Sequence, residues 1–191
     1  MLKRLSALCG LGLLMLGAVG CSCAPGRYNV TVQLDDAMRQ KLINLADRNI
    51  EVDLVAVNAK EHERWENYSM TQYWQPGDPL KGSIPTYTMI FDPRVAAPAS
   101  ATQPAAKFAT VQTLKSTDPI WNKWYANTTD KDVMRLYVLA LLPGTQEDAP
   151  GDKDPRRQIL PLGTCRWDTK DILLKVQTTG IITVTTPKPE K

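Results

Sequence analysis

The sequence predicts a mainly β (α+β) domain: an antiparallel two-sheet sandwich of the immunoglobulin or transthyretin kind, with two or three short helices. Several short segments alternate apolar and polar residues, which is typical of strands that bury one face. In the second half of the chain these segments follow one another with little helix-length sequence between them. This order favours an antiparallel sandwich over a doubly wound parallel sheet, which needs helices between its strands.

The first strand and the first helix are expected early in the chain. Residues 28–34 alternate strictly between apolar and polar side chains and predict a half-buried strand. Asp35 or Asp36 can then cap a short helix, because a carboxylate accepts hydrogen bonds from the first free N–H groups of a helix. Residues 50–57 alternate at first and then become wholly apolar, which predicts a strand that runs into the core.

A longer helix is expected next. Asn58 is followed by Glu61 at the spacing of a helix start. We therefore expect a helix over residues 59–74, which the Pro-Gly-Asp-Pro run at 76–79 brings to an end. Residues 87–91 alternate again and predict another strand.

The second half adds one capped helix and a series of strands. Asp118 and Pro119 supply a cap and a first-turn proline for a short helix. Residues 133–142 are the most apolar segment after the N-terminus and predict a central strand. Pro161 confines its segment to a sheet edge, because proline lacks the N–H that a strand ladder needs. The other expected segments are a flexible Ala- and Pro-rich loop at 94–106, a strand at 108–114, a polar surface loop at 145–157, a short strand at 159–162 and a hairpin of 171–177 with 181–186.

The N-terminus resembles the secretion signal of a bacterial lipoprotein. Two cations precede an apolar run over residues 5–19, which is shorter than the roughly 20 residues that a permanent membrane helix needs. The run ends in the small residues Ala18 and Gly20, which fit a peptidase groove, and then in Cys21, whose thiol can carry a diacylglycerol. The alternatives are an ordinary signal peptide cut near Gly20 or Ala24, or an N-terminal membrane anchor.

The lipoprotein resemblance implies where the mature protein begins and where it resides. The chain divides into a signal peptide (1–20), a lipidated tether (21–27), a sandwich domain (28–186) and a solvated tail (187–191). Ser22 is neutral in the sorting rule of such lipoproteins, in which an aspartate at that position favours the inner membrane. The expected location is therefore the periplasmic face of the outer membrane, with the protein held there by its acyl (palmitate) chains.

Charge and cysteine usage narrow the function further. The net charge of +3 falls to +1 once the two cations of the signal are removed, and no basic run suggests a nucleic-acid partner. Besides Cys21, the mature chain keeps Cys23 and Cys165, which can form a disulfide in the oxidising periplasm and fasten the tether to the domain. The alternative is two unpaired thiols, with Cys165 buried.

The sequence offers no catalytic constellation, no cofactor site and no metal site. The single histidine, His62, lies among charged neighbours in the helix predicted over 59–74 and is expected to be solvated. The motifs of phosphate loops, zinc proteases, paired cysteines and nucleophile elbows are absent. A calcium site in the acidic loop 147–154 lacks the EF-hand pattern; its candidate ligands are Glu147, Asp148, Asp152 and Asp154. We therefore expect a protein that is not an enzyme.

Aromatic side chains gather in the predicted helix 59–74. Protein interfaces favour Trp and Tyr, so this helix is the candidate partner-binding surface. The alternative is that its aromatic face covers the open side of a sheet. A glycan site on the same rings lacks neighbouring acids and amides. The candidate residues are Trp65, Tyr68, Tyr73 and Trp74.

The layout of the chain resembles the small outer-membrane lipoprotein of type VI secretion systems, the TssJ type. The matching elements are the lipobox at 18–21, the expected strands at 28–34, 50–57 and 136–142, and the closing hairpin at 171–186. The resemblance implies a transthyretin-like sandwich that binds the periplasmic part of an inner-membrane partner. Two family features differ: residues 51–54 read Glu-Val-Asp-Leu where an arginine is expected, and Arg166-Trp167 stands in reversed order. The helix 59–74 and the loop 94–106 also depart from the compact sandwich of that family.

Two functions follow from these observations. The first is a non-enzymatic, membrane-anchored periplasmic lipoprotein that binds an envelope protein, as an assembly component and, on the resemblance above, as part of a type VI secretion membrane complex. The alternative is a surface lipoprotein that binds a small molecule or a glycan.

Overall fold

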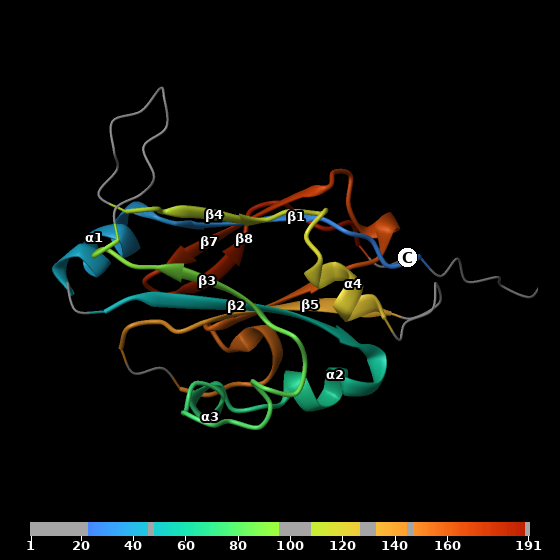
Figure 1. The fold of residues 1–191 in the computed structure, drawn as a ribbon, viewed down its shortest axis with the longest axis horizontal. Helices are drawn as coiled ribbons and strands as arrows, with labels where there is room; N and C mark the ends of the chain where they lie inside the picture. Colours follow the sequence, from blue (N-terminus) through green and yellow to red (C-terminus); the bar gives the residue numbers. More distant parts are fainter. Residues whose placement is uncertain (1–22, 46–47, 96–107, 127–132, 145–146, 190–191) are drawn as a thin grey trace, which may run out of the picture.

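The chain folds into a sandwich of two four-stranded sheets (Figure 1). The computed structural model describes residues 23–45, 48–95, 108–126, 133–144 and 147–189. Sheet I has the order β4-β1-β7-β8 and contains β1 (Asn29–Leu34), β4 (Val111–Leu114), β7 (Asp171–Gln177) and β8 (Gly180–Thr183). Sheet II has the order β3-β2-β5-β6 and contains β2 (Ile50–Asn58), β3 (Tyr87–Phe91), β5 (Met134–Ala140) and β6 (Arg157–Pro161).

Strand pairing is antiparallel except between β1 and β7. These two strands run parallel, with Asn29 opposite Asp171 and Leu34 opposite Val176. All the other neighbouring strands of the two sheets are antiparallel. The predicted mainly β sandwich is therefore confirmed, with one parallel pair that residue alternation alone does not reveal.

Most predicted elements are present near their expected positions. The helix α1 (Asp36–Asn44) is capped by Asp35, whose carboxylate accepts a hydrogen bond from the N–H of Met38 at 2.7 Å. The apolar strand β5 lies between β2 and β6, and the proline-limited strand β6 lies at the edge of sheet II. The signal segment 1–20, the lipidation candidate Cys21 and most of the loop 94–106 lie outside the described residues.

The helix predicted over 59–74 is interrupted. It consists of α2 (Ala59–Glu66) and α3 (Met70–Tyr73), with the cap residues between them. Asn58 caps α2 as expected, accepting from the N–H groups of the next helical turn. Ser69 starts a new helix, because its hydroxyl accepts a hydrogen bond from the backbone N–H of the third residue after it at 3.0 Å. The remaining helices are α4 (Ile120–Tyr125) and the 3₁₀ turns η1 (Gly151–Lys153) and η2 (Thr164–Arg166).

Sheet II is covered on both faces. Its inner face and that of sheet I enclose the main core. Its outer face carries Val55 and Val57 of β2 and Tyr137 and Leu139 of β5, which pack beneath α2, α3 and the segment after them (Figure 1). This second apolar layer explains why residues 54–57 are apolar without alternation. None of the helices among the described residues is long and apolar enough to cross a membrane.

Candidate functional site

The first candidate site is the end of the sandwich at which β1 and β7 begin. A disulfide joins Cys23 to Cys165 there, and the Cα atoms of the two residues are 5.6 Å apart. Cys165 is exposed, which contradicts the alternative of a buried free thiol. We call this region the Cys23 end and define it as residues 23–28, 115–126, 162–170 and 187–189.

Backbone hydrogen bonds hold the residues after Cys23 against the domain. The N–H of Gly26 donates to the carbonyl of Leu162 at 2.7 Å, and the N–H of Thr164 donates to the carbonyl of Ala24 at 2.9 Å. The predicted tether, residues 21–27, is thus part of the folded domain from Cys23 onwards.

Two tyrosines complete the attachment of this segment. Tyr125 of α4 donates its hydroxyl to the carbonyl of Gly26 at 2.6 Å, and Tyr28 donates its hydroxyl to the carbonyl of Gly163 at 3.0 Å. Burial raises the pKa of Tyr28 to about 12, so its hydroxyl keeps its proton and remains a donor. A side chain at Gly26 would not fit, because a Cβ there would lie 2.7 Å from the Tyr28 hydroxyl oxygen.

The aromatic partner-binding candidates largely face the interior. Trp65 and Tyr73 are 0% exposed and pack on each other, and Trp65 also packs on Tyr137. Neither can contact a partner, so the alternative interpretation, that the aromatic face covers the open side of a sheet, is correct for both. Tyr68 and Trp74 are half-buried at the rim of this layer and keep some accessible surface.

A buried carboxylate that was not among the predicted site residues lies beneath α3. Asp53 of β2 is 0% exposed and accepts hydrogen bonds from the Tyr73 hydroxyl at 2.9 Å and the Thr88 hydroxyl at 2.6 Å. The Lys81 ammonium lies 3.2 Å from the same carboxylate and 4.1 Å from the centre of the Trp74 ring. The charge is therefore paired, and the cluster fastens the segment after α2 to sheet II.

The segment predicted as a polar surface loop, 145–157, contains a second buried polar cluster. The Arg156 guanidinium pairs with Asp154 at 2.8 Å and also with Asp148. Asp148 accepts a further hydrogen bond from the backbone N–H of Thr71 at 2.9 Å, which ties this segment to α3. The surface prediction is wrong for Asp154 and Arg156, which are buried with their charges paired, whereas Asp148 is exposed as predicted.

The guanidinium of the next residue, Arg157, donates its hydrogen bonds to backbone carbonyl groups alone. Arg157 is 1% exposed, and its guanidinium donates to four carbonyl groups from the turn around η1 and the end of α2. Burial lowers the pKa of this guanidinium from its ordinary value. The three aspartates of 147–154 each accept a hydrogen bond from a backbone N–H. The described residues contain no group of three or more His, Cys, Asp or Glu side chains that could hold a metal ion.

His62 is half-buried, which corrects the expectation that it is solvated. Its Nδ1 is hydrogen-bonded to the Tyr137 hydroxyl, and its Nε2 lies 3.4 Å from the Glu66 carboxylate. Burial, and then the positive charge of Arg135, lower the pKa of His62. Tyr137 is 0% exposed, so no substrate can reach this hydrogen bond, and the group holds α2 on sheet II.

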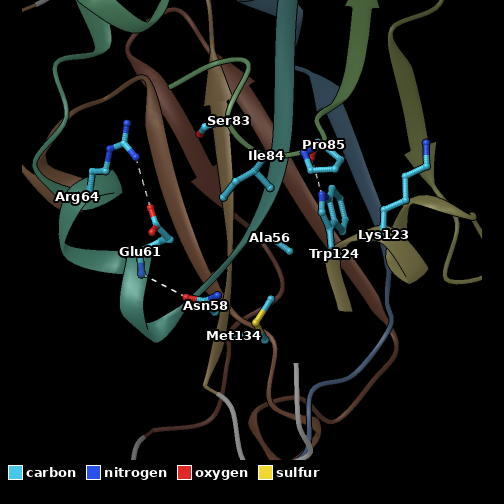
Figure 2. Close-up of a pocket in the computed structure, with 10 residues that line it drawn as sticks. All are labelled: Ala56, Asn58, Glu61, Arg64, Ser83, Ile84, Pro85, Lys123, Trp124 and Met134. Carbon is cyan, nitrogen blue, oxygen red and sulfur yellow. Dashed lines mark hydrogen bonds and ion pairs between the residues drawn. The ribbon is translucent and has the colours of Figure 1, made fainter. Parts of the chain in front are cut away.

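An open pocket of about 340 Å³ lies where β2 ends and α2 begins (Figure 2). Its polar lining is mostly engaged: Glu61 and Arg64 are 3.6 Å apart as an ion pair, and Ser83 donates its hydroxyl to a backbone carbonyl. Trp124 also lines it, but its ring is 5% exposed and its indole N–H donates to the carbonyl of Pro85 at 2.6 Å. The pocket therefore lacks the set of convergent, unpaired polar groups that would select a ligand.

Comparisons with known proteins add one distant likeness. No protein-family model matches the sequence, and no curated protein matches it either. Among solved structures, the fold is similar to Serratia marcescens Lip, a membrane-bound component of the type VI secretion system, with a TM-score of 0.43 and 12% sequence identity. The likeness covers 87% of this chain and 99% of that chain. At this TM-score it carries no argument about function.

Proposed function

We propose that this protein is a lipid-anchored component of the bacterial cell envelope, on the periplasmic face of the outer membrane, whose sandwich binds another protein. The Cys23–Cys165 disulfide is the observation that carries the proposal. Disulfides persist in oxidising compartments such as the periplasm and are rare in the cytosol. The disulfide therefore supports export independently of the lipoprotein-like N-terminus.

Binding is preferred to catalysis because the buried charged side chains of the described residues have structural partners. Asp53 and Arg156 are buried and hydrogen-bonded to Tyr73 and Thr71 of α3, and the half-buried His62 is hydrogen-bonded to the buried Tyr137. The pocket beside Trp124 presents paired polar groups, which favours a protein partner over a small molecule or a glycan. Membership of a type VI secretion membrane complex is a narrower hypothesis that rests on the layout of the sequence.

Lipidation is tested by growing the producing cells with labelled palmitate. We expect label in the full-length protein and none in Cys21→Ser, which keeps the rest of the chain. An unlabelled wild-type protein, or equal label in the variant, would exclude the lipid anchor.

Partner binding is tested by crosslinking in whole cells followed by purification of the anchored protein. Because Trp65 and Tyr73 are buried, the experiment tests two accessible regions: the rim at Trp74 and the outer face of sheet I, where Ile182 is 41% exposed. We expect either Trp74→Ala or Ile182→Lys to abolish one crosslinked product, while Arg39→Ala on α1 retains it. A product pattern that none of the three variants changes would count against a specific partner at these surfaces.

A further inference from the structure

We infer that the Cys23 end is a membrane-contact surface, on which the sandwich rests against the anionic headgroups of the bilayer that holds its lipid. This inference depends on the proposed lipidation of Cys21 and adds an orientation to it. The partner of this surface is the lipid bilayer. The domain lies directly against it and is not held at a distance by a flexible linker.

The first argument is the length of chain between lipid and domain. Consecutive Cα atoms are 3.8 Å apart, so the Cα of Cys21 stays within about 8 Å of the Cα of Cys23 in any conformation. Cys23 is fixed by its disulfide, and the next residues are fixed by the Ala24 and Gly26 hydrogen bonds. Only Ser22 separates the acylated residue from the folded domain. The Cys23 end therefore cannot move away from the headgroups.

The second argument is charge. The Cys23 end contains six cations but only two carboxylates, Asp118 and Asp168, and one further carboxylate, Asp171, follows directly at the start of β7. The Asp118 carboxylate accepts a hydrogen bond from the backbone N–H of Ile120. The Asp168 carboxylate forms an ion pair with the Lys188 ammonium at 2.5 Å. Residues 21–191 together carry only +1, so the remainder of the mature chain is net negative. The six cations are Arg27, Lys115, Lys123, Arg166, Lys170 and Lys188.

Anionic headgroups attract cations that lie within a Debye length, about 8 Å at physiological salt. Five of the six cations, all except Arg166, are exposed and belong to segments that also carry the disulfide or pack next to it. The short connection and the positive end thus favour the same orientation. In this orientation α1 and the turn after β3, at the opposite end of the sandwich in Figure 1, point away from the bilayer.

The inference is tested by lysine footprinting of the full-length lipidated protein. The protein is placed in phosphatidylcholine vesicles with or without phosphatidylglycerol, or in neutral detergent, and treated with a water-soluble acetylating reagent. We expect Lys123, Lys170 and Lys188 to react several-fold more slowly in the anionic vesicles than in detergent. Lys153 of η1 and Lys175 of β7 should react at unchanged rates. Equal changes in both groups would overturn the inference.

Three variants separate the argument from chain length and the argument from charge. Twelve Gly and Ser residues inserted between Ser22 and Cys23 keep the lipid and the disulfide but add a flexible span of about 20 Å, so the protection should weaken. Lys123→Glu with Lys170→Glu should reduce the protection of Lys188, whereas the same charge change at the far end, in Arg39→Glu with Arg48→Glu, should not. Unchanged protection in the first charge variant would refute the electrostatic contact.

The mass of the N-terminal peptide distinguishes the two levels of the proposal. A peptide without acyl chains on Cys21 would refute lipidation and, with it, the orientation. An acylated Cys21 combined with unprotected lysines would refute the contact surface alone and leave the lipid anchor in place.

Discussion

Removal of the disulfide is the perturbation whose cost can be worked out most directly. Cys23 and Cys165 are 142 positions apart, so in the unfolded chain the bond closes a loop that contains most of the domain. The loop-entropy relation gives about 5 kcal/mol at 25 °C for a loop of this length. The hydrogen bonds of Ala24 and Gly26 do not depend on the bond, so the native segment should stay in place. We therefore expect Cys23→Ser with Cys165→Ser to lower the free energy of unfolding by about 3–5 kcal/mol.

Urea unfolding followed by tryptophan fluorescence measures this change. Wild-type protein treated with a reductant should unfold at the same urea concentration as the double variant, because both lack the crosslink. The dependence of the unfolding free energy on urea should also become steeper, because an uncrosslinked unfolded chain exposes more surface. A loss below about 1 kcal/mol would show that the loop-entropy reasoning does not apply to this domain.

Three further predictions use the same assay. Asp53→Ala leaves the Tyr73 hydroxyl buried without an acceptor and should lower the free energy of unfolding by about 2–4 kcal/mol. The exposed Asp36→Ala should lower it by less than about 1 kcal/mol. Equal losses would contradict a stabilising role of the buried Asp53 cluster. Trp65→Ala removes the centre of the outer layer and should cost about 3–5 kcal/mol; a cost under about 1 kcal/mol would mean that this layer is loosely packed. Burial raises the pKa of Asp148, but hydrogen bonds from the start of α3 and from a guanidinium outweigh it and bring the pKa to about 2. The unfolded value is about 3.9, so the stability that Asp148 contributes is present above that pH and is lost as the pH falls towards 2. Asp148→Asn should therefore lose less stability than wild type between pH 4 and pH 2, and identical acid profiles would exclude this role.

The strands were predictable where one face of the strand meets water. The alternation at 28–34 and 87–91 identifies β1 and β3, because each strand turns alternate side chains towards the interior. The same pattern places Asp53 on the outer face of β2 beside Glu51, which is correct. It does not show that this outer face is covered, because the cover comes from a different segment of the chain.

Two of the four partner-binding candidates, Trp65 and Tyr73, were wrong for a related reason. Aromatic residues at helical spacing show that one side of a helix is buried, but not whether its own sheet or a partner buries it. For Trp65 and Tyr73 the cover is their own sheet. A usable signal was present in β2, since residues 54–57 lose their alternation and such a strand needs an apolar layer on both faces. The buried Arg157 gave no comparable signal, because its carbonyl partners belong to backbone and leave no mark in the sequence.

The double cover of sheet II has a consequence for how the molecule opens. Val55 and Tyr137 lie opposite each other in the β2–β5 ladder, with an apolar layer on either side. Their amide hydrogens can exchange with solvent only when both layers separate, whereas those of the edge strand β8 need only local fraying. Slow hydrogen exchange should therefore mark this ladder as the last part of the protein to unfold. Fluctuations at the edges can then occur without loss of the fold.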